Sequence, residues 1–385
     1  MNSVSSAAFA DTKPHYALLD GLRGVAALLV LWYHVNEGYG FAGYVNGVSD
    51  GLVTVFNHGY LAVDFFFILS GFVIGYAYDD RWQHGFTQKA FCKRRLIRLH
   101  PLVMLGAVIG LVTFLLQGGV QWDGSHVATS LVMLSLLCAM FMIPAIPGAA
   151  YEVRGNGEMF PLNGSAWSLF FEYIGNILYF LLLRRLSTKA LGTLGCILGV
   201  LLAWFTIGDV TGLGSFGVGW TLDGMNFWGG LLRMLFPYTV GMWISRVFRP
   251  AKVKGAFWLC SAALTALFAV PHISSEGLLS LNGAFEAFCI IIAFPSLVWI
   301  AASEKATGKR TLQLCKWLGD LSYPLYIVHY PFMYLFYAWL IRHEIYTFEA
   351  CWQLSLAVMV WNIVLAWICL KLFDEPVRRY LSRRF

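Results

Sequence analysis

The sequence predicts an all-α protein, a polytopic transmembrane helical bundle of about ten transmembrane helices plus one re-entrant or interfacial segment. Of the 385 residues, 58% are hydrophobic and only 12% are charged, and the mean hydropathy is +0.65. The apolar residues form separate stretches of about 20 residues, the length that crosses the hydrocarbon core of a bilayer. Lys and Arg gather between these stretches, which is typical of the cytoplasmic loops of membrane proteins.

Ten apolar stretches predict ten spanning helices. In the second of them, Gly71 and Gly75 are spaced four residues apart, which favours close packing against another helix. The expected helices lie near residues 18–37, 60–78, 99–117, 166–183, 190–207, 228–246, 255–271, 283–302, 320–341 and 352–372.

An eleventh apolar stretch, residues 127–147, ends in IPAIPG. If it crosses the membrane, the basic clusters before and after it lie on opposite faces. If it is re-entrant or interfacial, all but three of the 27 Lys and Arg side chains share one face, the exceptions being Arg154, Arg233 and Arg342. The positive-inside rule favours the second arrangement, with both termini cytoplasmic.

This topology divides the chain into a cytoplasmic N-terminal tail over 1–17, a transmembrane domain over 18–373 and a basic cytoplasmic C-terminal tail over 374–385. The net charge of +6 is then a matter of orientation in the membrane and of contact with membrane lipid. The sequence contains no nucleic-acid-binding motif. Its eight Cys occur singly, so we expect no metal site and no disulfide.

The first apolar stretch, LLDGLRGVAALLVLWYHV, contains ionisable residues at both ends. Arg23 lies near its cytoplasmic end, and His34 follows about 16 Å further along at 1.5 Å per residue. A charged group at membrane depth costs roughly 2.5 to 3.5 kcal/mol, so such residues usually face a cavity. We expect Asp64 and Glu172 at a depth similar to that of His34, where either carboxylate could orient the imidazole as a general base. The alternative is that His34 only faces lipid headgroups.

Arginines also suggest where an anionic ligand would bind. The basic segment 81–98 ends in KRRLIR, which places Arg95 and Arg98 on one helix face. Guanidinium groups suit bidentate phosphate recognition. These charges could instead only set the topology or contact anionic lipid. Arg23 differs because it lies inside a span, where it would hold an anionic ligand or a carboxylate.

Four further polar or aromatic residues are candidates for contact with a substrate or with an oxyanion. Ser70 and Ser168 offer hydroxyl groups at membrane depth, and Trp167 precedes Ser168. His329 lies in LSYPLYIVHYP, near the middle of the membrane, where it could instead be a packed structural histidine.

Five sequence blocks, in order, resemble the acyltransferase 3 family of integral membrane acyltransferases. The block LDGLRGVAALLVLWYH is similar to the family's first helix, whose Arg/Lys-x10-His pattern falls on Arg23 and His34. Two departures are His100, where an aromatic residue is common, and Glu172, which lacks the second adjacent Glu of many members. The other similar blocks are GYLAVDFFFILSGFVI, FCKRRLIRLHP, NGSAWSLFFE and LGDLSYPLYIVH.

The resemblance implies a protein of the bacterial inner (cytoplasmic) membrane that transfers an acyl group from cytoplasmic acyl-CoA. The expected donor is acetyl-CoA, without a metal, and the expected acceptor is a hydroxyl on a carbohydrate or lipid-linked glycan. His34 would be the catalytic base with Arg23 in support, and Arg95 and Arg98 would help to bind the donor. A transient acyl-histidine is an alternative route.

Two other functions remain open at the level of sequence. The acceptor could be a lipid or a secreted natural product. The chain could also be a transporter in which the outer histidine and carboxylates relay protons, although it lacks the paired broken helices common in transporters.

Overall fold

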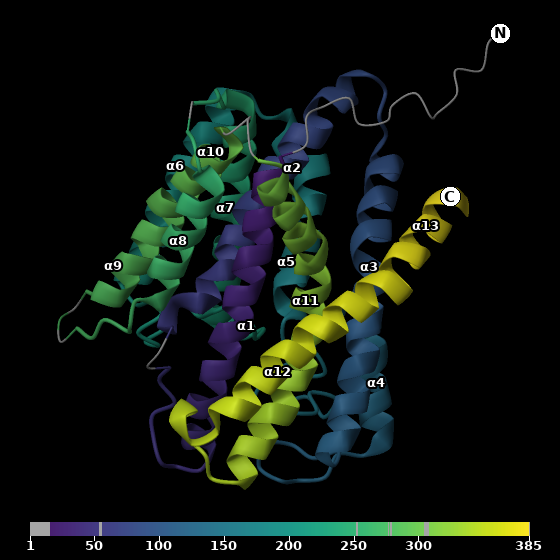
Figure 1. The fold of residues 1–385 in the computed structure, drawn as a ribbon, viewed down its shortest axis with the longest axis vertical. Coiled ribbons are helices and arrows are strands. Elements are labelled where there is room, and N and C mark those ends of the chain that lie inside the picture. Colours follow the sequence, from purple (N-terminus) through teal and green to yellow (C-terminus); the bar gives the residue numbers. More distant parts are fainter. Residues whose placement is uncertain are drawn as a thin grey trace.

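The computed structural model describes residues 16–53, 56–251, 253–275, 277, 279–303 and 308–384. These form a helical bundle in which the start of α1 and the end of α13 both lie toward the upper end in Figure 1. The helices are α1 (Ala17–Val45), α2 (Ala62–Gln83), α3 (Gln88–Gln117), α4 (Thr129–Met140), α5 (Ala166–Leu181), α6 (Thr188–Ile207), α7 (Gly224–Val247), α8 (Ala256–Ala269), α9 (Leu281–Phe288), α10 (Phe294–Ser303), α11 (Lys309–Arg342), α12 (Phe348–Cys369) and α13 (Glu375–Arg384).

Each of the ten predicted helices is found, but several are longer than their apolar stretch. α1 continues to Val45, α3 begins at Gln88 and α11 begins at Lys309. Hydropathy identifies only the part of a helix that lies in lipid, whereas the hydrogen-bonded ladder continues into polar sequence. Short π-helical segments join α9 to α10 and α12 to α13, so the basic C-terminal segment continues a helix.

Seven helical stretches in the described part of the chain are long and apolar enough to span a membrane. The prediction of about ten spans is therefore supported only in its coarser form, a multi-pass helical protein. The seven stretches are Ala17–Val45, Asn57–Gln83, Gln88–Gln117, Ala166–Arg185, Thr188–Ile207, Leu281–Ser303 and Phe348–Arg384.

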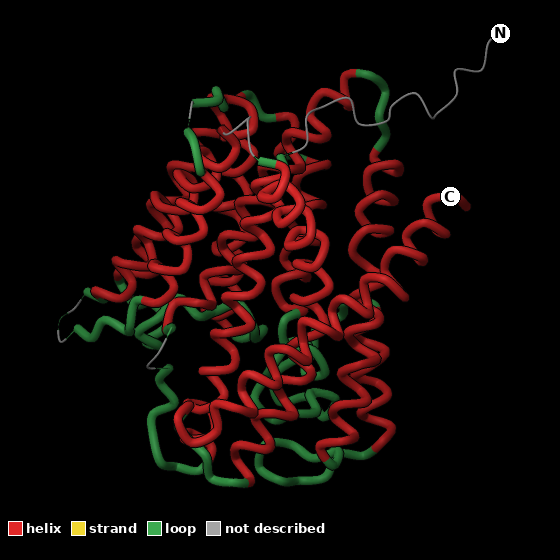
Figure 2. Tube along the Cα trace, viewed as in Figure 1, coloured by secondary structure: helices red, strands yellow, loops and turns green. Residues whose placement is uncertain are grey.

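α4 corresponds to the ambiguous eleventh stretch. It has 12 residues, so it is about 18 Å long at 1.5 Å per residue, which is less than a hydrocarbon core of about 30 Å. Figure 2 shows the loop segments before and after α4 in the lower half of the molecule. This arrangement agrees with the re-entrant alternative and places residues 141–165 at the lower end of the bundle.

α1 and α11 form the most extensive helix pair of the bundle. They lie in parallel, and glycine allows their backbones to approach closely. A Cβ at Gly24 would lie 2.4 Å from the Leu318 carbonyl oxygen, and a Cβ at Gly319 would lie 2.7 Å from Asp20 Cβ. This pair holds Arg23 near its upper end and His34 lower down.

α2 and α7 form the second extensive pair. A Cβ on Gly71 would lie 2.0 Å from the Tyr238 carbonyl oxygen, and one on Gly241 would lie 2.1 Å from the Ile68 carbonyl oxygen. Gly75 faces Met242 and Ser245 of α7. The predicted small-residue face of the second helix is therefore confirmed.

We expect Gly71→Ala to destabilise the protein by about 1 to 3 kcal/mol, because a methyl group cannot fit against a rigid carbonyl unless α2 and α7 separate. Thermal unfolding in detergent measures the loss. Gly195→Ala is the matched control, since its Cβ would meet only a methyl group of Val240, at 3.4 Å, which is an ordinary van der Waals contact. Equal melting temperatures for the two variants would contradict the close α2–α7 contact.

Candidate active site

A cavity of about 740 Å³ lies between α1, α2, α3, α5 and α11, and we call it the arginine cavity because Arg23, Arg95 and Arg98 line it. Arg95 donates to Glu172 Oε1 at 2.6 Å, and Ser70 Oγ donates to the same oxygen at 3.1 Å. Arg95 and Glu172 therefore neutralise each other within this cavity.

Arg23 and Arg98 differ in how they are held. Arg23 donates to Ser322 Oγ at 2.8 Å and to the Gly319 carbonyl oxygen at 3.1 Å, and it forms an ion pair with Asp20 at 3.0 Å. Within the described chain, Arg98 has no hydrogen-bond or ion-pair partner, and its side chain is exposed. Arg98 can therefore bind an anion without first breaking a protein contact.

A second cavity of about 2030 Å³ lies lower in the bundle, and we call it the histidine cavity because His34 lines it. Much of its wall is aromatic, with a few carboxylate, amide and hydroxyl groups between the rings. Aromatic side chains present an apolar face together with a polar edge or hydroxyl. Its aromatic lining residues are Tyr33, Phe41, Tyr44, Tyr60, Trp122, Trp167, Trp220, Tyr326, Tyr330, Tyr334 and Tyr337.

His34 is paired with a carboxylate from its own helix. Its Nδ1 lies 2.7 Å from Glu37 Oε2, so Nδ1 carries the hydrogen and donates, which leaves Nε2 with a lone pair. Tyr337 donates its hydroxyl to Glu37 Oε2 at 2.8 Å, and Tyr33 donates to Glu37 Oε1 at 3.3 Å. These contacts fix the tautomer of the imidazole that a general base requires.

His329 packs beside His34 but is sealed from the cavity. The two ring centroids are 5.3 Å apart, and His329 is 0% exposed. Its Nδ1 contacts the Leu325 carbonyl oxygen at 2.9 Å, and its Nε2 has no partner among the described residues. His329 can therefore position His34, and it does not border the space where a substrate would lie.

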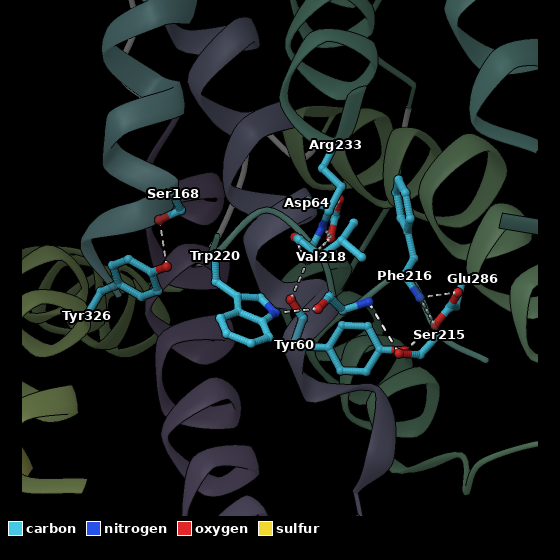
Figure 3. A network of polar contacts seen from close by, with 11 residues as sticks. Tyr60, Asp64, Ser168, Ser215, Phe216, Val218, Trp220, Arg233, Glu286 and Tyr326 are labelled. Carbon is cyan, nitrogen blue, oxygen red and sulfur yellow. Dashed lines mark hydrogen bonds and ion pairs between the residues drawn. The ribbon is translucent and has the colours of Figure 1, made fainter. Parts of the chain in front are cut away.

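Val63 and Tyr326 line both cavities and form the septum between them. Tyr326 shares a hydrogen bond of 2.6 Å with Ser168 Oγ, which Figure 3 shows between α11 and α5. Its ring also contacts Phe66 edge to face, with centroids 5.4 Å apart. Arg23 and His34 thus lie on opposite sides of a thin septum.

Asp64 forms a buried ion pair with Arg233. The carboxylate is 0% exposed and the guanidinium side chain 2% exposed, and Arg233 Nη2 lies 2.6 Å from Asp64 Oδ2. Arg233 also donates to the carbonyl oxygens of Val218 at 2.8 Å and Tyr60 at 3.0 Å, as Figure 3 shows. The pair therefore fixes the backbone of segment 208–223, part of which lines the histidine cavity.

Glu286 secures the same segment from the other side. Its two carboxylate oxygens accept from the Phe216 backbone N–H at 3.0 and 2.9 Å, and Tyr60 donates its hydroxyl to the same carboxylate. These contacts appear at the right of Figure 3. Two buried carboxylates, Asp64 and Glu286, thus hold the wall of the histidine cavity.

The opposite wall comes from residues 141–165, which pack onto α11. Pro331 has no N–H to donate to the Ile327 carbonyl oxygen, and Asn163 Nδ2 donates to that oxygen at 3.0 Å. Arg154 donates to Gln117 at 2.8 Å and lies 3.5 Å from the Tyr334 ring centroid. A proline in α11 thereby provides an anchoring point for this loop beside His329.

Glu158 faces the histidine cavity from this loop. It accepts a hydrogen bond from Asn156 Nδ2 at 2.8 Å and another from the Tyr334 hydroxyl. Burial raises the pKa of the Glu158 carboxyl from 4.5 to about 7, although the Arg154 charge opposes the rise. Glu158 was not predicted from the sequence, because its loop carries no recognisable motif.

The predicted carboxylate partners of His34 are wrong. Asp64 faces α7 and pairs with Arg233, and Glu172 lines the arginine cavity. Glu172 lies deeper than expected because residues 141–165 fill the lower end of the bundle before α5 begins at Ala166. The sequence signal for Glu37 was its spacing of three residues from His34, which places both on one helix face.

The other predicted residues divide between the two cavities. Ser70 and Ser168 line the arginine cavity, whereas Trp167 lines the histidine cavity. The centroid of the Trp167 ring also lies 5.1 Å from the Arg233 guanidinium carbon. Among the described residues, no three His, Cys, Asp or Glu side chains form a group that could hold a metal ion.

Comparison with known proteins assigns nearly the whole chain to one family. A sequence model of the acyltransferase domain family matches residues 16–371. The chain is 25% identical over 391 residues to the acyltransferase MdmB of Streptomyces mycarofaciens, covering 95% of this chain and 92% of that protein. It is 26% identical over 319 residues to BcsY, a proposed membrane-bound transacylase of Komagataeibacter xylinus, covering 81% and 72%.

A shorter match is closer in sequence. Protein 2 in the picA locus of Rhizobium radiobacter is 33% identical over 171 residues, which are 43% of this chain and 80% of that protein. No solved structure matches the chain.

Glu158 gives the folded protein a pH-dependent stability. Because its folded pKa of about 7 lies above the ordinary 4.5, the folded state retains a proton that the unfolded chain releases between these values. Stability is therefore lost as pH rises through about 7, by up to about 3 kcal/mol. We expect the melting temperature of the wild type to fall relative to that of Glu158→Gln between pH 5 and 8.

The exposed residue Glu344 provides the control for loss of one carboxylate, as Glu344→Gln. A constant difference in melting temperature between the wild type and Glu158→Gln across this pH range would mean that Glu158 titrates as an exposed carboxylate does.

Proposed function

The chain belongs to the acyltransferase domain family, and we propose that it transfers an acyl group from cytoplasmic acyl-CoA to a hydroxyl of an exported or cell-surface carbohydrate. The observation that carries this proposal is the pair of cavities, one lined by arginines and one by His34, that meet at Val63 and Tyr326. Two substrates that approach from opposite sides of a membrane need this arrangement.

The arginine cavity is the proposed donor site. Acyl-CoA is a polyanion at one end and a thioester at the other. Arg98 is free to bind phosphate, and Arg23 and Arg95 add positive potential to the same cavity. Arg23 and His34 are separated by about 16 Å along α1, so a donor arm about half as long as the hydrocarbon core is thick would bring the thioester to the septum.

His34 is the proposed general base. Nε2 takes the proton of the acceptor hydroxyl, and the oxygen attacks the thioester carbonyl carbon while Glu37 stabilises the imidazolium. The tetrahedral intermediate then expels CoA as its thiolate, which receives the proton from His34.

The histidine cavity supports a carbohydrate as the acceptor class. Flat aromatic rings pack against the C–H faces of sugar rings, and carboxylate and amide groups between them accept and donate hydrogen bonds to sugar hydroxyls. Glu158, Asn156 and Trp220 line this cavity together. Acetyl is the proposed acyl group because it is the smallest and needs the least space at the septum.

We expect His34→Ala to lower acyl transfer by about 10² to 10⁴, the usual contribution of a general base. Glu37→Gln should lower it by roughly tenfold or more, since the imidazole loses the group that fixes its tautomer. The measurement is mass spectrometry of acylated surface glycans from deletion cells that express each variant at equal membrane abundance.

Glu349→Gln is the matched control. Glu349 is an exposed carboxylate at the start of α12 and does not line the histidine cavity. Wild-type glycan acylation in the His34→Ala cells would refute the assigned base. Identical glycans in the deletion strain and its parent would instead refute a carbohydrate acceptor.

Tyr326→Ala should raise hydrolysis of acyl-CoA without acceptor severalfold, because it removes the side chain that separates the two cavities. Tyr326→Phe keeps the ring but loses the hydrogen bond to Ser168, so it should hydrolyse donor faster than the wild type and more slowly than Tyr326→Ala. Free CoA released by purified protein measures both.

Tyr323→Ala is the control, since Tyr323 lines only the arginine cavity. Equal hydrolysis by Tyr326→Ala and Tyr323→Ala would mean that the septum is not the barrier.

A further inference from the structure

A third cavity of about 780 Å³ lies between α3 and α13, and we call it the α3–α13 groove. Figure 1 shows α13 passing close to α3 at the upper right, and the two helices are in contact. Four arginines line the groove, with Glu375 as the one carboxylate among its lining residues. The full lining is Arg94, Ile97, Arg98, Glu375, Arg378, Arg379 and Ser382.

The groove remains positively charged after its internal ion pairs are counted. The buried Asp374 carboxylate holds Arg378 at 2.7 Å, and Lys371 pairs with Glu375, so the one lining carboxylate is neutralised. Arg98 and Arg379 have no hydrogen-bond or ion-pair partner in the described part of the chain, and both are exposed. At least two guanidinium groups are therefore available to an anion.

Arg98 belongs both to this groove and to the arginine cavity. The two spaces thus meet at a side chain that no protein group holds. A long ligand with phosphates at one end and an uncharged arm at the other would fit across both, with its charge in the groove and its arm in the arginine cavity.

We propose that the α3–α13 groove binds the phosphorylated nucleotide end of acyl-CoA, so that α13 is part of the donor site. This inference rests on the proposed function. The nucleotide end of CoA carries a pyrophosphate and a ribose 3′-phosphate, and guanidinium pairs suit such groups. The path through Arg98 favours the donor over an anionic lipid headgroup, which needs no route into the bundle.

The test measures binding of adenosine 3′-phosphate 5′-diphosphate, the nucleotide end alone, by calorimetry. The protein is purified whole and placed in nanodiscs of neutral phosphatidylcholine. We expect the groove variant Arg379→Gln to bind about tenfold more weakly than the wild type, because it loses charge-assisted hydrogen bonds while the Arg378–Asp374 ion pair is left intact. The control is Arg383→Gln, which removes the same charge from α13 outside the groove and should bind as the wild type does.

The kinetic arm compares acyl-CoA with acyl-pantetheine, which lacks the nucleotide. The groove variant should raise KM for acyl-CoA and leave kcat, and KM for acyl-pantetheine, unchanged. Equal nucleotide binding by the groove variant and the wild type would overturn the inference. So would a difference that arises only in nanodiscs containing phosphatidylglycerol, which would identify a lipid headgroup site.

The two proposals fail in different ways. If the wild type binds the nucleotide and loses it in the groove variant, but releases no CoA with any acceptor, the donor site stands and the transferase proposal fails. If CoA is released and depends on His34 while the groove variant binds normally, the transferase stands and the role of α13 fails.

Discussion

The close contact between α1 and α11 is the constraint on which the site depends. Gly24 and Gly319 let the two backbones approach to a distance that no larger residue would permit. Arg23 is then held by Ser322, and Tyr337 reaches both the His34 carbonyl oxygen, at 2.8 Å, and the carboxylate that orients its ring. One helix pair therefore sets the positions of the arginine and of the histidine together. In lipid, where hydrophobicity does not drive helices together, such packing is the main source of precision.

The buried ion pair of Asp64 and Arg233 holds the wall of the histidine cavity. Asp64 and Arg233 desolvate each other, and removing either one would leave an uncompensated charge at a cost of about 3 to 5 kcal/mol. In return the guanidinium binds two backbone carbonyls that lie on segments of the chain far apart in sequence. Phe216 and Val218 of segment 208–223 are buried in the apolar core, and Arg233 adds a polar contact that fixes the Val218 carbonyl oxygen.

Much of the fold could be predicted from the sequence because the bilayer leaves few choices: apolar stretches of sufficient length become helices. Arg23 and His34 could also be identified, since an ionisable residue inside a span is rare. The partner of His34 could not, because matched depth says nothing about helix rotation. Asp64 faces α7 and not His34, whereas Glu37 is the last residue of the helix expected over 18–37 and lies on the same helix face as His34. Glu158 depends on a loop whose path is set by tertiary contacts alone.

For the acyl transfer proposed above, the septum explains why two cavities suit the chemistry better than one channel would. A continuous polar passage would admit water and let it compete with the acceptor for the thioester, and it would also provide a path for ions through the bundle. A side chain such as Tyr326, held by one hydrogen bond to Ser168, closes that path at a cost of about 1 kcal/mol to reopen. Binding of the two substrates from opposite sides can supply that energy. Under the proposed function, transfer would require both substrates, and the septum would close again when either one leaves.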